Sequence, residues 1–304
     1  MKPRKLLPNS PGQRPWLRGA VRGAQPKTSP ASQGTPLQLV SPARRLYIGL
    51  RSFGNLGGLP SVLIVGAQKA GTSSLFRWLS RHPQVAKPLI KEVHYFDYQS
   101  KKNKDWYAAN FDGRPERIRI DASPYYLFHP KVPERAANLL PHCKIICLLR
   151  DSVDRAFSHY QMNLRLGIEH LEFYDAVKAE PKRLGASAEM LEKEAIDYHF
   201  GHQNFSYVSR GLYGCQIKNW LRFFPVERFH FISFDDLIYQ PLSVLEGVEQ
   251  FLGLSSFNFD DLCPRNQGKG VSLPVDARTG LAPLFEESNR QVLEITGLSI
   301  QRAS

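Results

Sequence analysis

A short segment between two glycines carries residue types that suit the binding of an anion. The segment Gly66–Ser73 reads GAQKAGTS and places Lys69 between the glycines. The apolar run Val62–Val65 before it predicts a strand, and the spacing of apolar residues after it predicts a helix over Thr72–Arg81. This order lets backbone N–H groups and the positive end of the helix dipole surround a phosphate or sulfonate. An ordinary strand–helix turn with a solvated lysine is the alternative.

The position of the lysine distinguishes this loop from that of nucleoside-triphosphate-binding proteins. Their loop continues with Lys-Ser/Thr after the second glycine, whereas Thr72 and Ser73 follow Gly71 here. A lysine inside the loop lies nearer to a short 5′ group and can neutralise the oxygen that bridges a phosphate and a sulfonate. Sulfonate transfer depends mainly on in-line positioning and on electrostatic stabilisation of that oxygen, so we expect no metal.

A second candidate anion site follows the apolar run Lys144–Leu149, which predicts a buried strand. Arg150 comes directly after it, at the edge where open α/β sheets bind ligands, and its guanidinium can hold a phosphate through two hydrogen bonds. Ser158 lies about two turns along a helix predicted over residues 152–164 and can add a hydroxyl donor. An ion pair between Arg150 and a nearby aspartate is the alternative.

Two acids and a histidine lie close together in the segment Lys91–Asp97, KEVHYFD. If the segment is extended, Glu92 and His94 point to the same side and can face one cavity. An acceptor hydroxyl or amine must lose its proton as it attacks sulfur, which requires a carboxylate or an imidazole nearby. An exposed charged segment without a catalytic role is the alternative.

The two candidate anion sites together resemble those of sulfotransferases that use 3′-phosphoadenosine 5′-phosphosulfate (PAPS). The resemblance is to heparan sulfate 3-O-sulfotransferases, N-sulfotransferase domains and bacterial sulfotransferase-domain proteins. IVGAQKAGTSSLFRWLSRHP is similar to the family's 5′-phosphosulfate loop, and LLRDSVDRAFSHY is similar to its 3′-phosphate motif. The resemblance implies PAPS as the donor and Lys69 as the catalytic lysine. It further implies donor contacts from Gln68, Lys69, Ala70, Gly71, Thr72, Ser73, Ser74, Arg150 and Ser158.

Further motifs extend the resemblance over residues 60–297. KEVHYFD is nearly the family's KEVHFFD, which implies Glu92 as the general base, supported by His94 and Asp97. The sequence RGLY, which ends at Tyr213, resembles another landmark and adds this tyrosine to the expected cofactor contacts. Lys269-Gly270 matches a step in a late loop over the adenine and the 3′-phosphate, although valine follows where the heparan enzymes often have arginine.

The sequence DASPYY resembles a segment of the heparan 3-O enzymes that reads acid–Lys–Ser/Thr–Pro. In those enzymes the lysine lies in the substrate cleft, so Asp121 and Ser123 become candidate substrate contacts. Ala122 replaces the lysine. An anionic polymer calls for clustered cations, so this replacement argues against heparan sulfate itself as the acceptor.

Strands that alternate with helices predict the architecture that must position these residues. Further strands are predicted over Arg117–Ile120 and Phe229–Ser233. We therefore expect an α/β, P-loop-like, three-layer fold with a central, mostly parallel sheet flanked by helices. Residues 59–304 are expected to form the sulfotransferase domain. Residues 1–58 are expected to be a disordered or weakly ordered, Pro-rich basic segment, with a transit peptide or a misassigned start codon as alternatives.

The net charge of +12 is concentrated in residues 1–58, which hold ten of the 40 Lys and Arg and no acid. The remaining 30 basic and 28 acidic residues nearly balance, so we expect no nucleic-acid partner. No apolar run reaches the roughly 18 residues that a membrane span needs, and we expect a cytoplasmic protein. Free thiols at Cys215 and Cys263 are favoured over a disulfide.

These observations predict an enzyme that moves a sulfonate group from PAPS to a hydroxyl or amine of a saccharide or a small metabolite. Two other functions are open. One is a P-loop nucleotide kinase or NTPase, which would need the post-glycine lysine and a Mg²⁺-holding aspartate at a strand end, and neither is evident. The other is an inactive nucleotide-binding scaffold, against which the presence of Lys69 and Glu92 argues.

Overall fold

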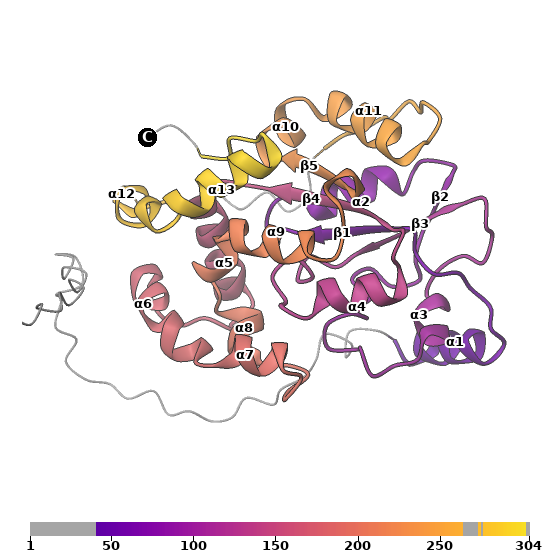
Figure 1. Cartoon of the computed structure of the whole chain (residues 1–304), viewed down its shortest axis with the longest axis horizontal. Coiled ribbons are helices and arrows are strands. Elements are labelled where there is room, and N and C mark those ends of the chain that lie inside the picture. Colours follow the sequence, from indigo (N-terminus) through magenta and orange to yellow (C-terminus); the bar gives the residue numbers. More distant parts are fainter. Residues whose placement is uncertain (1–40, 264–272, 275, 302–304) are drawn as a thin grey trace, which may run out of the picture. The chain divides into compact units, whose positions relative to one another are not determined.

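Five parallel strands form one sheet in the computed structural model, which describes residues 41–263, 273–274 and 276–301 (Figure 1). The strand order is β2-β3-β1-β4-β5, so β1 and β4 are central neighbours. The register pairs Leu63 of β1 with Asp121 of β3 and with Ile145 of β4. The strands are β1 (Val62–Gly66), β2 (Val85–Ala86), β3 (Ile118–Ala122), β4 (Lys144–Leu149) and β5 (Phe229–Ser233).

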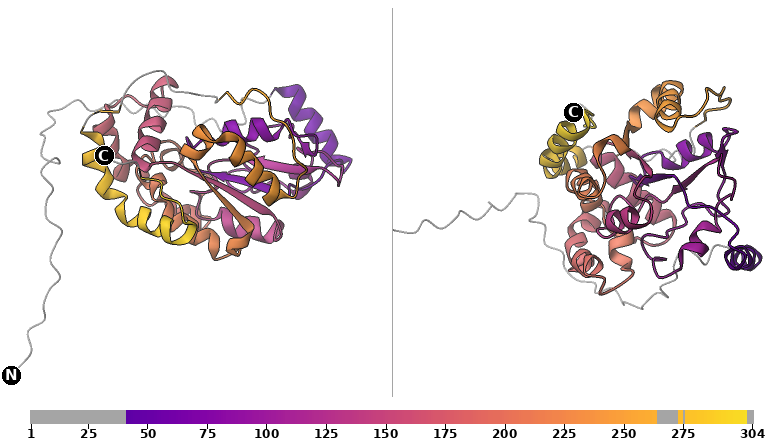
Figure 2. Two further views of the ribbon diagram at one scale, coloured as in Figure 1. Left: turned by 90° about the horizontal axis from the view of Figure 1, so that it is seen from above. Right: turned by 45° about the vertical axis from the view of Figure 1, so that its right-hand side comes forward.

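Helices cover both faces of the sheet, which confirms the predicted three-layer α/β fold. Figures 1 and 2 show α4, α9 and α13 over one face and α2 over the other. The helices are α1 (Pro42–Phe53), α2 (Thr72–Leu79), α3 (Lys104–Ala108), α4 (Val132–Leu139), α5 (Ser152–Arg165), α6 (Phe173–Leu184), α7 (Ser187–Glu192), α8 (Phe200–Asn204), α9 (Tyr213–Leu221), α10 (Phe234–Tyr239), α11 (Pro241–Leu252), α12 (Ala277–Leu281) and α13 (Glu286–Thr296).

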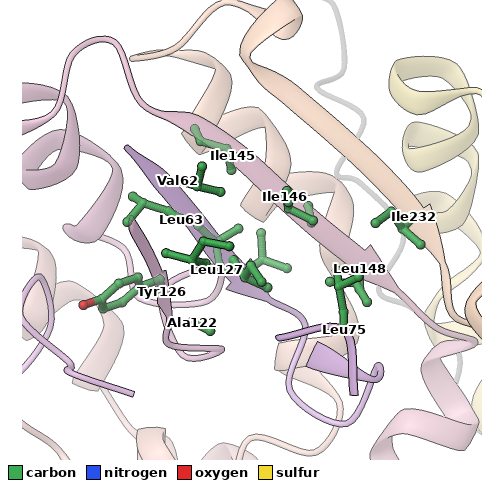
Figure 3. Packing of buried hydrophobic residues seen from close by; sticks show 14 of the residues in the cluster. Val62, Leu63, Leu75, Ala122, Tyr126, Leu127, Ile145, Ile146, Leu148 and Ile232 are labelled. Carbon is green, nitrogen blue, oxygen red and sulfur yellow. The ribbon is translucent and has the colours of Figure 1, made fainter. Parts of the chain in front are cut away.

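The main core lies where the central strands meet α2. Every residue of β1 is buried, and Leu63 belongs to the same buried cluster as Ile145, Ile146 and Leu148 of β4 (Figure 3). Leu75 reaches this cluster from α2 because residues 75, 78 and 79 form the buried side of that helix. Burial of this apolar surface fixes the ends of β1 and β4, and therefore the loops that follow them.

Helix α1 corrects one prediction, because it falls inside the segment expected to be disordered or weakly ordered. The hydroxyl of Ser41 accepts a hydrogen bond of 3.4 Å from the N–H of Arg44, and Pro42 occupies the first turn. Both features favour a helix start. The side chain of Ile48 is buried against the rest of the chain. Arg51 of this helix also donates to the carbonyls of Ala109 and Phe111, which are 58 and 60 residues away. Contacts so distant in sequence cannot be read from local composition.

Two further observations concern membranes and thiols. Among residues 41–263, 273–274 and 276–301, no helix has both the length and the apolar character needed to cross a bilayer. All four cysteines are free; Cys143 and Cys147 are buried, whereas Cys215 and Cys263 are exposed.

Candidate active site

The loop between β1 and α2 needs glycine at both of its ends. Gly71 precedes α2 with φ of 87°, a left-handed conformation that favours glycine. A Cβ atom there would lie 2.4 Å from Cδ2 of Leu237, and one at Gly66 would lie 2.7 Å from Cβ of Leu127. Close packing and backbone conformation together therefore explain the glycine spacing seen in the sequence.

The start of α2 offers hydrogen-bond donors to an anion. Within the described chain, the N–H groups of Gly71, Thr72 and Ser73 donate to no protein acceptor, whereas the N–H of Ser74 donates to the carbonyl of Gly71 at 2.9 Å. The dipole of α2 places its positive end at the same point. Free N–H groups at the start of a helix are a common binding site for phosphate and sulfonate groups.

Cationic side chains surround the loop. Burial, together with the positive charges of Arg165, Arg150 and Arg155, lowers the pKa of Lys69 to about 8. Nη1 of Arg150 donates to the carbonyl of Lys69 at 3.1 Å, so the two anion motifs predicted from the sequence lie in contact. This excess of positive charge is stabilised when an anion occupies the loop.

Arg150 is held from both sides. Its guanidinium carbon lies 4.4 Å from the ring centroid of Phe234, and its carbonyl accepts a hydrogen bond of 3.1 Å from the hydroxyl of Tyr213. Tyr213 itself is fully buried. Tyr213 therefore supports Arg150 through its carbonyl. A direct contact of Tyr213 with the cofactor stays a prediction.

Ser158 is half-buried on α5, the helix that begins directly after Arg150 and Asp151. Asp151 caps this helix by accepting from the N–H groups of Val153 and Asp154 at 3.0 and 2.9 Å. The expected late-loop contacts, Lys269 and Gly270, lie outside the described residues.

Sequence reasoning missed a buried arginine beneath the loop. Nη1 of Arg210 donates to Oε1 of Gln68 at 2.7 Å, and Nε donates to the hydroxyl of Ser206 at 3.1 Å. The guanidinium lies 5.0 Å from the ring centroid of Tyr125 and 5.1 Å from that of Phe128. Arg210 thus fixes the side chain of the half-buried Gln68 from below the loop. The signal was present in the sequence RGLY, whose arginine received no role.

A chain of hydrogen bonds connects the loop to the candidate base. Nζ of Lys91 donates to the hydroxyl of Ser73 at 2.6 Å and to Oε1 of Glu92 at 2.9 Å. Oε2 of Glu92 lies 3.6 Å from Nε2 of His94, whose Nδ1 donates to Oδ2 of Asp97 at 2.6 Å. The three residues predicted to act together are therefore brought together.

The backbone of this segment differs from the expected extended strand. Glu92 and His94 have φ of 59° and 55°, and turns follow over residues 95–100. Hydrogen bonds and burial, rather than strand alternation, bring the two side chains to one place. The argument from alternation was wrong, although its residues were the right neighbours.

The charges of this cluster are strongly coupled. Burial alone would raise the pKa of Glu92, but the hydrogen bond from His94 and the positive charges of Lys91 and His94 outweigh it and lower the pKa to about 2. Burial would lower the pKa of His94, but the negative charge and hydrogen bond of Asp97, joined by Glu92, raise it to about 10. At neutral pH the cluster therefore contains a carboxylate beside an imidazolium.

Asp121 and Ser123 lie behind the cluster and have no exposed surface. The hydroxyl of Ser123 donates to Oδ1 of Asp121 at 2.8 Å and accepts from the N–H of His94 at 3.2 Å. Oδ2 of Asp121 accepts from the hydroxyls of Tyr107 and Tyr126, both at 2.8 Å. This burial argues against the expected contact with an acceptor and shows that the pair positions His94.

A basic groove of about 740 Å³ begins beside the Lys91–Ser73 hydrogen bond. Arg81 donates to the carbonyls of Asp260 and Asp261, and Arg77 lies 3.7 Å from the carboxylate of Asp261. The groove thus runs from the candidate base along α2. Its lining residues are Ser73, Phe76, Arg77, Ser80, Arg81, Lys87, Pro88, Lys91 and Asp261.

Comparison with known proteins decides which family contains this site. Residues 59–264 match the family described as "Sulfotransferase domain". The chain belongs to this sulfotransferase family. Its members are enzymes with PAPS as the general donor, and the P-loop-like α/β fold agrees with theirs. Nothing in the comparisons supports the kinase alternative.

Several individual sulfotransferases are similar to the chain. Mouse heparan sulfate glucosamine 3-O-sulfotransferase 5 is 32% identical over 64% of this chain and 54% of its own length. Membrane-associated sulfotransferase kil1 of Dictyostelium discoideum is 25% identical over 80% of this chain and 66% of its own length. A sulfotransferase structure from Alicyclobacillus acidocaldarius is 30% identical with a TM-score of 0.66, covering 80% of this chain and 97% of that one.

These relatives correct one expectation. The chain spans 66% and 54% of the length of the two curated relatives just described. One of them is named as membrane-associated, which contradicts the expected cytoplasmic location. Composition and the lack of a long apolar run were insufficient grounds for that expectation.

Proposed function

We propose that this protein transfers the sulfonate of PAPS to a hydroxyl or amine of an anionic saccharide. The single observation that carries the proposal is the placement of Lys91. Its ammonium group contacts both Ser73, at the start of α2, and Glu92, in the base cluster. A donor held at the start of α2 and an acceptor beside Glu92 would therefore meet at one point.

The donor fits the groups around the loop. PAPS supplies a sulfonate on a 5′-phosphate, together with a 3′-phosphate. The N–H groups of Gly71, Thr72 and Ser73 would hold the 5′ end, and Lys69 would stabilise the oxygen that remains on the phosphate when the S–O bond breaks. Arg150 and Ser158 would hold the 3′-phosphate, a group that ATP lacks. Lys269 and Gly270 are proposed as further contacts of the nucleotide.

Glu92 would accept the proton of the acceptor. The acceptor oxygen or nitrogen forms a bond to sulfur while the bond from sulfur to the phosphate oxygen breaks, and its proton passes to the carboxylate. A pKa of about 2 keeps Glu92 ionised, and the attacking atom becomes acidic as its bond to sulfur forms. His94, fixed by Asp97, would orient the carboxylate.

The acceptor class follows from the groove. Arg77, Arg81, Lys87 and Lys91 line it together with one carboxylate, that of Asp261, among the lining residues that the structure describes. A saccharide with carboxylate or sulfate groups suits this charge. Curated relatives are named as heparan sulfate sulfotransferases, which supports an acidic saccharide, whereas Ala122, in place of the lysine implied by the resemblance, argues against heparan sulfate itself.

Two measurements test the proposal. Thermal stabilisation by 3′,5′-adenosine diphosphate should exceed that by ATP with Mg²⁺, and the reverse order would contradict a PAPS site. Labelled PAPS should then be incubated with neutral, carboxylated and sulfated oligosaccharides of equal length. Incorporation should be highest in the charged series. Incorporation confined to neutral sugars would refute the proposed acceptor class while leaving the donor site intact.

A further inference from the structure

Helix α1 presents a row of apolar side chains to solvent. Leu46, Leu50 and Phe53 have exposed fractions of 66%, 62% and 96%. Their spacing of four and three residues places them on one side of the helix. Single exposed apolar residues are normal on a protein surface, whereas several large ones side by side are typical of an interaction surface.

The opposite side of α1 is attached to the domain. Ile48 is buried, and Arg51 donates to the carbonyl of Ala109 at 2.9 Å and to that of Phe111 at 2.7 Å. Figure 2 shows α1 at the margin of the described chain. The apolar row is therefore held in a fixed orientation, and whatever binds it carries the whole domain.

Charge decides between the possible occupants of this row. Arg44 and Arg45 are exposed on the first turns of α1. Residues 1–40 carry seven Lys and Arg and no acid, so this segment would meet α1 with charge of the same sign. A second copy of α1 would bring the same arginines. An anionic lipid surface complements α1 in two ways. Its headgroups carry negative charge for the arginines, and its acyl chains form an apolar layer for the row of apolar side chains.

We propose that α1 docks this protein on an anionic membrane surface. Leu46, Leu50 and Phe53 enter the boundary between headgroups and acyl chains, while Arg45, at the flank of this row, lies at the level of the phosphates and Arg44 adds positive charge from the far side of the helix. The binding is peripheral and reversible, because a single short helix buries only a few apolar side chains. It concerns a different face from the donor loop and does not depend on the identity of the acceptor.

Co-sedimentation with vesicles tests the proposal on the full chain. Wild-type protein should pellet with phosphatidylcholine vesicles that contain phosphatidylserine, less with phosphatidylcholine alone, and less as salt is raised. The triple variant Leu46→Ser, Leu50→Ser, Phe53→Ser should bind at least about tenfold more weakly. The double variant Arg44→Glu, Arg45→Glu should lose the preference for phosphatidylserine.

The control is the triple variant Tyr239→Ser, Leu242→Ser, Leu293→Ser, which removes three large exposed apolar residues outside α1 and should bind like wild type. Both triple variants should keep the thermal shift given by 3′,5′-adenosine diphosphate. Three results would overturn the proposal: no binding of wild-type protein, equal loss in the control, or a dimer that dissociates only in the α1 variant. A lowered Tm of the α1 variant without vesicle binding by wild type would show that the chain itself covers the row.

Discussion

Lys91 donates a hydrogen bond of 2.6 Å to the hydroxyl of Ser73, across 18 residues of sequence. The same ammonium lies 2.9 Å from Glu92. A segment that follows β2 is in this way tied to the first turn of α2. The binding of a negatively charged donor at Ser73 is therefore coupled electrostatically to the carboxylate proposed as the base.

Replacement of Lys91 tests this coupling. Lys91 is one of the groups that lower the pKa of Glu92 to about 2, after the hydrogen bond from His94. Lys91→Ala should therefore move the acidic limb of the kcat/KM profile to higher pH, by about one unit. Lys91→Arg should keep the limb near its original position. An unchanged profile in Lys91→Ala would show that another group controls that limb.

Lys69 is expected to matter for catalysis and little for folding. Lys69→Ala should lower kcat by about 100- to 1000-fold, the usual cost of removing a donor that stabilises a developing negative charge. The side chain is only partly buried, so the free energy of unfolding should change by less than about 1 kcal/mol. Transfer of labelled sulfonate, measured beside a melting curve, separates the two effects. Wild-type turnover by this variant would contradict the proposed role.

The 3′-phosphate site is best tested by comparing two nucleotides. Arg150→Ala should weaken binding of 3′,5′-adenosine diphosphate by about 100-fold and that of 5′-AMP much less, because only the former has a 3′-phosphate. Ser158→Ala should show the same selectivity with a loss of about fivefold. Asn289→Ala on α13, a residue outside both anion motifs, serves as the control. Equal losses for both nucleotides would place the 3′-phosphate elsewhere, and calorimetric titration measures all of these affinities.

The imidazolium of His94 should make stability depend on pH. Its pKa rises from 6.5 in the unfolded chain to about 10 in the folded one. Its contribution is therefore complete below pH 6.5 and is lost as pH rises towards 10. His94→Gln should cost about 1 to 3 kcal/mol in the lower range and progressively less above it. Urea unfolding across this range, with exposed His142→Gln as the control, measures the difference. A pH-independent loss would show that His94 folds in its neutral form.

The groove should determine how acceptors bind. Lys87 is exposed on its wall. Lys87→Glu should raise KM for a sulfated oligosaccharide by about tenfold and change KM for PAPS much less, because Lys87 is not among the proposed donor contacts, although Ser73 of the donor loop borders the groove. Lys102→Glu makes the same change of charge on the exposed segment before α3 and should have little effect. Equal effects of the two variants would indicate general electrostatics rather than a binding site.

The central strands and the start of α2 could be predicted from the sequence. There the residues with proposed chemical roles directly follow apolar runs that predict buried strands. The apolar run Lys144–Leu149 has the same limits in the structure as in the prediction, and α2 begins at Thr72 as expected. Short buried strands between loops have few other possible structures. The two-residue strand β2 gave no such pattern and was not predicted.

The surroundings of the site depended on contacts that are distant in sequence. Arg210 reaches Gln68 across 142 residues, and no local pattern shows that distance. Asp121 and Ser123 were expected to face a cleft, yet Asp121 is buried where β3 pairs with β1, and Ser123, which follows β3, is buried as well. Ala122, between them, is buried too, and it offers no cation where the resemblance implies a lysine.

The pairing of β1 with β4 also has a consequence for how this scaffold can diversify. Backbone hydrogen bonds between adjacent strands set the spacing between the Gly66–Gly71 loop and Arg150, and side-chain replacements do not alter it. The groove, by contrast, is built mainly from side chains of α2, of the two residues after it and of residues 87–91, which can vary without disturbing that ladder. Related proteins can therefore differ in the acceptor they bind while they keep the same spacing between the two proposed anion sites of the nucleotide.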